Sequence, residues 1–196
     1  MRKQLITALV QHANQALTPQ VAREILDQLF PARAYPPQAF GQRTYKGYTF
    51  QAESMTGLTD EIHPLHRQHY LETDKHRAGI AMNPDYEGFA ERERSGSLIQ
   101  FTSRTLAGEL VGHMRVVIGT STHTQTLFCE EDSFYVVPAH RGGFMAVRLW
   151  QFVEDSVRSI GVREVRFGSR LANRADQMAK YLKYTPVATQ FVKILD

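Results

Sequence analysis

The residues best suited to chemistry lie in one run, residues 134–146, where an apolar segment precedes a glycine pair. The run reads Phe-Tyr-Val-Val-Pro-Ala-His-Arg-Gly-Gly-Phe-Met-Ala and predicts a buried strand, a turn and a helix start. Backbone N–H groups at a helix start point outward, and the helix dipole favours an anion there. Gly142 and Gly143 let the backbone approach a phosphate, and Arg141 adds a positive charge. The alternative is a turn whose glycines serve backbone geometry alone.

The same run excludes two other phosphate sites. It has only two glycines and no Lys-Ser/Thr pair, so it is not a nucleoside-triphosphate P-loop. The preceding expected strands do not alternate with helices, which excludes a dinucleotide-binding fold.

A second cluster of reactive side chains lies in one expected helix and just after it: His63, His66, His69 and His76, with Glu72 among them. Their spacing brings His69, Glu72 and His76 to a common side. No His-Glu-x-x-His pattern occurs, and the same helix turned inward is simply amphipathic. We therefore predict no metal site.

The elements before the main domain follow from hydrophobic spacing. Residues 1–30 predict two short helices, the second begun by Thr18 as N-cap and Pro19 in the first turn. Residues 30–43 contain three prolines and predict a linker. The expected division is a helical hairpin with its linker over 1–44 and a main domain over 45–196.

The main domain is expected to alternate between strand and helix patterns, with no internal repeat. Expected strands cover 45–53, 98–104, 109–118, 127–137, 162–167 and 187–195. One expected helix begins near Thr59, and three more cover 85–94, 144–160 and 173–183. The middle strands look antiparallel, so the pattern predicts a mixed α/β domain.

Composition and charge exclude several classes. The chain has 196 residues, of which 42% are hydrophobic and 22% charged, as in a globular domain rather than a disordered or coiled-coil chain. No stretch reaches the roughly 18 apolar residues of a membrane span, and no signal-like core is present. Cys129 is the single cysteine, which excludes an intrachain disulfide and favours a reducing, cytoplasmic setting. The net charge of +3 is too small to indicate nucleic-acid binding.

Val136-Val137-Pro138 and the Arg141-to-Ala146 segment resemble the acetyl-CoA motif of the GNAT N-acetyltransferase superfamily. That motif is a strand ending in Val-x-Pro, then Arg/Gln-x-x-Gly-x-Gly/Ala opening a long helix. Phe144 occupies the position of the motif's middle glycine. A large side chain there either crowds the pyrophosphate or makes Gly143 the residue that approaches the pyrophosphate closely. The Asn83-Pro84-Asp85-Tyr86 insert is similar to small phage-encoded proteins of this type. The resemblance implies an α/β (α+β) fold: a mixed, mostly antiparallel sheet flanked by helices, with an N-terminal helical extension.

The resemblance also implies acetyl-CoA as co-substrate and no metal. Two strands splay apart in this family, here 127–137 and 162–167, and their free backbone groups bind the pantetheine arm. In this chain those groups belong to Tyr135, Val136 and Val137, and one N–H would stabilise an oxyanion. Asn173 resembles an asparagine near the CoA, with a helix N-cap as its alternative role. The residues expected around the pyrophosphate are Arg141, Gly142, Gly143, Phe144, Met145 and Ala146.

Acetyl transfer to an amine needs a base for the amine. The run Glu130-Glu131-Asp132 lies where family members often carry a carboxylate. Period-2 alternation puts Glu131 on one face with Ser133 and Tyr135. Glu131 is therefore the candidate base, and a solvated acidic hairpin arm is the alternative.

The leaving thiolate gains from an acid, which in this family is a tyrosine of the last helix. Ala179 occupies that position here, so Tyr181 is the candidate acid, with Tyr184 also nearby. His69, Tyr70 and Glu72 are expected on the acceptor side, because the first helices of the family's domain border that pocket.

The resulting prediction is an acetyl-CoA-dependent N-acetyltransferase that acts by direct attack of an amine on a protein, an RNA or a small molecule. The alternative is a catalytically decayed GNAT fold serving as a phage structural or host-interaction module. Residues 1–44 cannot bury a core of their own. They are expected to dock on the main domain or a protein partner, or to mediate self-association. No membrane partner is expected.

Overall fold

The computed structural model describes residues 2–29, 35–74, 77, 79–169 and 175–195 of the chain. In chain order the elements are α1 (Arg2–Gln11), α2 (Pro19–Leu29), η1 (Pro37–Phe40), β1 (Gln42–Tyr45), β2 (Tyr48–Ala52), α3 (Met55–Thr73), α4 (Tyr86–Arg94), β3 (Leu98–Thr105), β4 (Leu110–Thr120), β5 (Leu127–Val136), η3 (Pro138–His140), α5 (Met145–Ser159), β6 (Glu164–Arg166) and α6 (Ala175–Tyr181).

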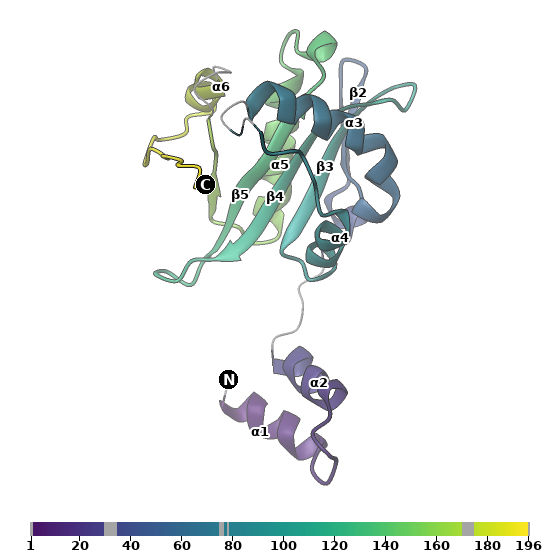
Figure 1. Ribbon diagram of the computed structural model, residues 1–196, viewed down its shortest axis with the longest axis vertical. Helices are drawn as coiled ribbons and strands as arrows, with labels where there is room; N and C mark the ends of the chain where they lie inside the picture. Colours follow the sequence, from purple (N-terminus) through teal and green to yellow (C-terminus); the bar gives the residue numbers. More distant parts are fainter. Residues whose placement is uncertain (1, 30–34, 75–76, 78, 170–174, 196) are drawn as a thin grey trace.

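The strands of the described residues form one six-stranded sheet in the order β1-β2-β3-β4-β5-β6. Neighbouring strands from β1 to β5 are antiparallel, and β6 is parallel to β5. Helices α3 and α4 lie on one face and α5 on the other (Figure 1). The predicted mixed, mostly antiparallel sheet flanked by helices is confirmed.

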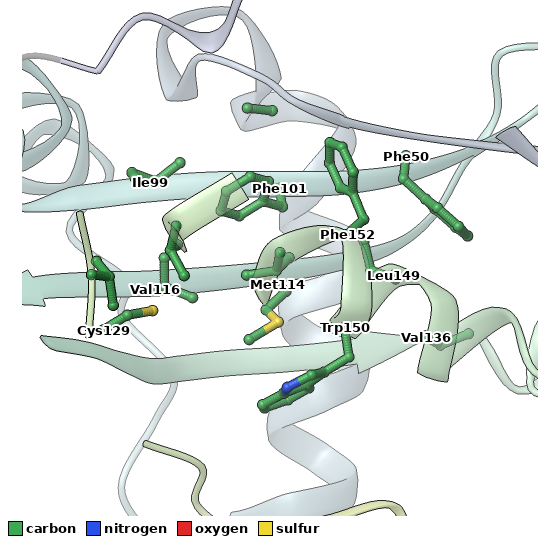
Figure 2. Packing of buried hydrophobic residues seen from close by; sticks show 14 of the residues in the cluster. Phe50, Ile99, Phe101, Met114, Val116, Cys129, Val136, Leu149, Trp150 and Phe152 are labelled. Carbon is green, nitrogen blue, oxygen red and sulfur yellow. The ribbon is translucent and has the colours of Figure 1, made fainter. Parts of the chain in front are cut away.

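The larger core lies between the sheet and α5. Leu149, Trp150, Val153 and Val157 recur at helical spacing and are fully buried there. Figure 2 shows Leu149 and Trp150 against the sheet, together with Cys129, the buried single cysteine. A smaller cluster under α3 contains Met55, Leu58, Ile62, Leu65, Leu98, Leu110 and Tyr135.

Helix α3 begins at Met55, earlier than expected, because Ser54 caps it. The Ser54 hydroxyl accepts a hydrogen bond from the Thr56 N–H, and Glu93 Oε2 accepts one from the Met55 N–H at 3.2 Å. These two acceptors satisfy N–H groups that a helix start leaves free. The cap fixes where α3 crosses the sheet and therefore which of its side chains reach β4 and β5.

Strand β5 carries the irregularity that matters most for function. Its pairing with β4 shifts register between Arg115 and Val116, so that Arg115 pairs with Ser133 while Val116 pairs with Glu131. Asp132 is the extra residue, which is a β-bulge and bends the strand. Strand β6 pairs with β5 only as far as Glu130. Beyond that point the described strands leave one edge of β5 unpaired up to Val136.

Three predicted elements differ from the structure. The strand expected over 45–53 is a hairpin, because Lys46 (φ 44°) and Gly47 (φ 86°) form a tight turn between β1 and β2. Residues 37–45, mostly expected as linker, form η1 and β1 and pack on the sheet. The strand expected over 187–195 does not form, and its apolar side chains are exposed.

Helices α1 and α2 pair with each other, apart from the sheet in Figure 1. Ala8 and Ile25 are buried between them. Five large apolar side chains of these helices stay exposed: Leu5, Ile6, Leu9, Val10 and Leu26. Docking of this hairpin and division of the chain at residue 44 stay predictions, although a cut at 44 would divide β1. No described helix has the length and apolar character needed to cross a membrane.

Candidate functional site

The unpaired edge of β5 ends at Val136. The Val137 N–H donates to the Val111 carbonyl at 2.9 Å, so it points toward β4. Because antiparallel strands alternate the direction of their backbone groups, the N–H and C=O of Val136 point to the open edge. Of the three residues predicted to bind a pantetheine arm, Val136 therefore presents both groups outward. The carbonyl accepts from Arg141 Nε at 2.7 Å, which leaves the N–H for a ligand.

The edge leads directly into the start of α5. Gly143 has a φ of 70°, in the left-handed region that favours glycine, and Cβ atoms built on Gly142 and Gly143 would meet nothing within 4 Å. Within the described chain, the N–H groups of these two glycines donate to no acceptor. Met145 is buried, and Ala146 packs partly buried against the core, so both anchor the helix. An exposed backbone cradle at the positive end of α5 fits the diphosphate of acetyl-CoA.

Phe144 does not fill this cradle. The residue is 47% exposed, and its ring lies 5.6 Å from the ring of Tyr181, measured between centroids. Of the two alternatives for this position, the arrangement favours close approach at Gly143.

Arg141 and Glu72, predicted on the cofactor and acceptor sides, form one ion pair. Both terminal nitrogens of Arg141 donate to the carboxylate of Glu72, at 2.8 and 2.7 Å. The guanidinium also lies 5.1 Å from the ring centre of Tyr135. Arg141 thus ties the end of α3 to the open edge of β5.

On the α3 side of the same edge lies His69. Its Nδ1 is 3.1 Å from the hydroxyl oxygen of Ser133, and its ring centre is 5.4 Å from that of Tyr135. The Tyr135 hydroxyl donates to Gln68 Oε1 at 3.1 Å, and burial raises the pKa of this tyrosine. Tyr70 does not join this group, because its hydroxyl donates to the Ile80 carbonyl instead.

Beneath His69 are two buried histidines. His113 has no exposed surface, and neither ring nitrogen has a hydrogen-bond partner among the described residues. The ring of His66 meets that of His113 edge to face, with 4.8 Å between centroids, and its Nδ1 lies 3.0 Å from the Tyr86 hydroxyl. Burial lowers the pKa of His66 to about 3 and that of His113 well below its usual value, so both stay uncharged at neutral pH. The described residues hold no group of three or more His, Cys, Asp or Glu arranged for a metal ion.

Glu131 lies on the opposite face from His69. It pairs with Val116, whose side chain belongs to the core under α5, whereas Ser133 faces α3. The expectation that Glu131 shares a face with Ser133 and Tyr135 is therefore wrong, because the bulge at Asp132 breaks the alternation. Its carboxylate lies near Gly168, just beyond β6.

The two candidate acids have different surroundings. Tyr181 is 58% exposed and lies next to Phe144 at the start of α5. The Tyr184 hydroxyl accepts from Trp150 Nε1 at 2.7 Å and donates to Glu154 at 2.6 Å, and burial raises its pKa. Tyr184 is therefore a structural anchor. Asn173 lies outside the described residues.

Sequence reasoning missed Ser133, Gln68 and His113 as members of this site. The i, i+3 spacing of His66 and His69 was a signal that one helix face carries imidazoles. Their partners on β4 and β5 depend on sheet register, which periodicity does not provide. A separate hollow of about 420 Å³ lies elsewhere, between the second half of α5 and residues 182–185.

Comparison with known proteins assigns the family. The model of the acetyltransferase (GNAT) family matches residues 59–181, and the chain belongs to this family. No curated protein matches the sequence.

Solved structures share the fold. A ribosomal-protein-alanine N-acetyltransferase from Brucella melitensis biovar Abortus 2308 is 17% identical with a TM-score of 0.55, covering 76% of this chain and 98% of that one. An aminoglycoside acetyltransferase from an uncultured soil metagenomic sample, in complex with sisomicin, is 12% identical with a TM-score of 0.61, covering 76% and 97%. A predicted acetyltransferase from Clostridium acetobutylicum, solved with acetyl-CoA, is 11% identical with a TM-score of 0.58, covering 76% and 96%. At these identities the likeness establishes the fold alone.

Proposed function

We propose that this protein transfers the acetyl group of acetyl-CoA to an amine by direct attack. The observation that carries the proposal is the continuous backbone surface from Val136 to Gly143. It joins an unpaired strand edge to a helix start whose glycine N–H groups have no acceptor in the described chain. The pantetheine arm and the diphosphate of acetyl-CoA carry hydrogen-bonding groups that can pair with these backbone groups.

In this proposal the Gly142 and Gly143 N–H groups hold the phosphates, and the Val136 N–H donates to the oxygen of the reacting carbonyl. Glu131 and Tyr181 are the sequence-based candidates for base and acid. The position of Tyr181 beside the start of α5 supports a role next to the cofactor. In this proposal acetyl-CoA supplies the thioester, and the residues named here position its reacting carbonyl.

The acceptor is an amine on a protein, an RNA or a small molecule. Alanine-terminated peptides and aminoglycosides are sensible first probes, because structural neighbours carry those names. A phage origin, a cytoplasmic setting and a partner for residues 1–44 remain predictions of the sequence.

Calorimetric titration with acetyl-CoA tests the cofactor half of the proposal. Arg141→Glu removes the positive charge beside the cradle and the ion pair with Glu72. Glu72→Gln removes the same ion pair and keeps the positive charge, so it is the matched control. We expect Arg141→Glu to weaken binding at least tenfold, about 1.4 kcal/mol, and Glu72→Gln to bind as tightly as the wild type or more tightly.

No binding by the folded wild type would contradict the proposal and favour an interaction module on this fold. Equal weakening by both variants would mean that the ion pair itself, rather than the charge of Arg141, supports the site.

A further inference from the structure

We propose that His69, held in place by Ser133, accepts the proton that the acceptor amine must lose before it attacks. This inference rests on the proposed acetyl transfer and names the residue that acts on its acceptor side. The observation behind it is the 3.1 Å contact between His69 Nδ1 and Ser133 Oγ on the unpaired stretch of β5.

The two sides of the open edge are not equivalent. A cofactor bound at Gly142 and Gly143 extends from the α5 side and fills the approach to the edge from there. An amine must therefore arrive from the side of α3, where Ser133 and Tyr135 face His69. Glu131 lies on the α5 side of the strand, across from this approach.

The carboxylates near His69 are engaged by arginines, which leaves its imidazole as the candidate proton acceptor. On the acceptor side, Glu72 is engaged by Arg141, and Asp132 accepts from Arg115 Nε at 2.6 Å. An imidazole has an ordinary pKa matched to proton exchange near pH 7. The rings of His113 and Tyr135 face His69 directly. The charged and polar groups in contact with these two rings or with His66 include Gln68, Arg115 and Arg141, and the two arginines pair with Asp132 and Glu72.

The two buried histidines beneath His69 add no positive charge near its ring. His66 and His113 stay uncharged at neutral pH, so a proton on His69 meets no cationic histidine. Ser133 holds the ring through Nδ1 and so fixes its orientation toward the edge.

The proton balance is complete. His69 takes one proton from the ammonium form of the acceptor and passes it to solvent. The neutral nitrogen forms a C–N bond to the acetyl carbon, and the C–S bond breaks with its electron pair on sulfur. The second nitrogen proton leaves as the amide forms, and one proton ends on the CoA thiol.

The test compares two small amines in a thiol-release assay with the full-length protein. Glycinamide is largely an ammonium ion at neutral pH, with an ordinary α-amine pKa of about 8. Hydroxylamine is uncharged there and needs no prior deprotonation. We expect His69→Gln to slow the glycinamide reaction about 100-fold at pH 7 and the hydroxylamine reaction much less. Ser133→Ala should shift the acidic limb of the glycinamide pH profile. The matched control is His63→Gln, an exposed histidine of the same helix, which should leave both rates unchanged.

Imidazole nitrogen shifts of the acetyl-CoA-bound protein give a second readout that needs no turnover. We expect the His69 nitrogens to change protonation state over the pH range in which the glycinamide rate rises, and the midpoint of that change to move when Ser133 is replaced. A His69 whose protonation state does not change over that range overturns the proposal, as does equal slowing of both amines. Loss of the acidic limb in Glu131→Gln, with the limb intact in His69→Gln, assigns the base to Glu131. Absence of acetyl-CoA binding in the wild type would instead contradict the proposed function.

Discussion

The buried histidines make the folded state sensitive to acid. Burial lowers the pKa of His66 to about 3 and lowers that of His113 well below 6.5, whereas both regain the ordinary value of 6.5 on unfolding. The unfolded chain therefore binds more protons below pH 6.5. Stability is fully present above that pH and is lost as the pH falls through the range below it.

His113→Leu tests this dependence. Because neither ring nitrogen of His113 has a partner among the described residues, the apolar replacement should change the free energy of unfolding at pH 7 by less than about 2 kcal/mol. Between pH 6.5 and 4 the loss of stability per pH unit should shrink by up to about 1.4 kcal/mol, one proton's worth. Urea unfolding at a series of pH values measures both. An unchanged pH slope would show that His113 is not the titrating group.

Separate substitutions of Gly143 and Phe144 test the proposed cofactor site. Gly143→Val places a β-branched residue at a φ of 70° and should weaken acetyl-CoA binding at least tenfold. Phe144→Ala should change affinity less than threefold, about 0.7 kcal/mol, because the ring points to Tyr181. Calorimetry on both variants, with thermal melts as folding control, decides. A marked gain in affinity from Phe144→Ala would mean that the ring does crowd the pyrophosphate.

At the scale of elements, hydrophobic patterns predicted the helix and strands that bury a face, such as α5 and β3 to β5. It could not predict the bulge at Asp132, because both sides of a bulge keep ordinary strand residues. Glu131 was therefore assigned to the wrong face, while the turn at Gly142 and Gly143 was recognised from residue type. Contacts such as Arg141 with Glu72 depend on tertiary packing between distant segments, which local patterns do not contain.

The segments after α6 differ in how firmly they are attached. Val187 and Phe191 are each 90% exposed, so removing residues 187–196 should change the free energy of unfolding by no more than about 0.5 kcal/mol. Tyr184→Phe should lower it by about 1–3 kcal/mol, because it leaves Trp150 Nε1 and Glu154 without their partner. Urea denaturation of both variants makes the comparison. A loss above about 2 kcal/mol on truncation would show that the expected last strand forms in solution.

At the scale of the whole molecule, two N-terminal deletions test the predicted division of the chain at residue 44. Deletion of 1–34 removes α1 and α2 and should leave the unfolding free energy within about 1 kcal/mol of the wild type. Deletion of 1–44 also removes Phe40, whose ring lies 5.5 Å from that of Phe101, and the Arg43–Asp155 ion pair. That deletion should lower the unfolding free energy by about 3 kcal/mol or more. Equal stability of the two deletions would show that β1 contributes little to the sheet.

Cys129 makes local opening between β5 and β6 measurable. The residue is fully buried and is the strand partner of Val165 on β6, and burial raises the pKa of its thiol to about 12. A maleimide or similar reagent reacts with the thiolate, so the closed sheet shields the residue and only an opened one is labelled. With a single cysteine, labelling kinetics report one site and need no mutagenesis. Among the described residues β6 pairs with β5 at three positions, so labelling that is faster than global unfolding would report local opening of this edge.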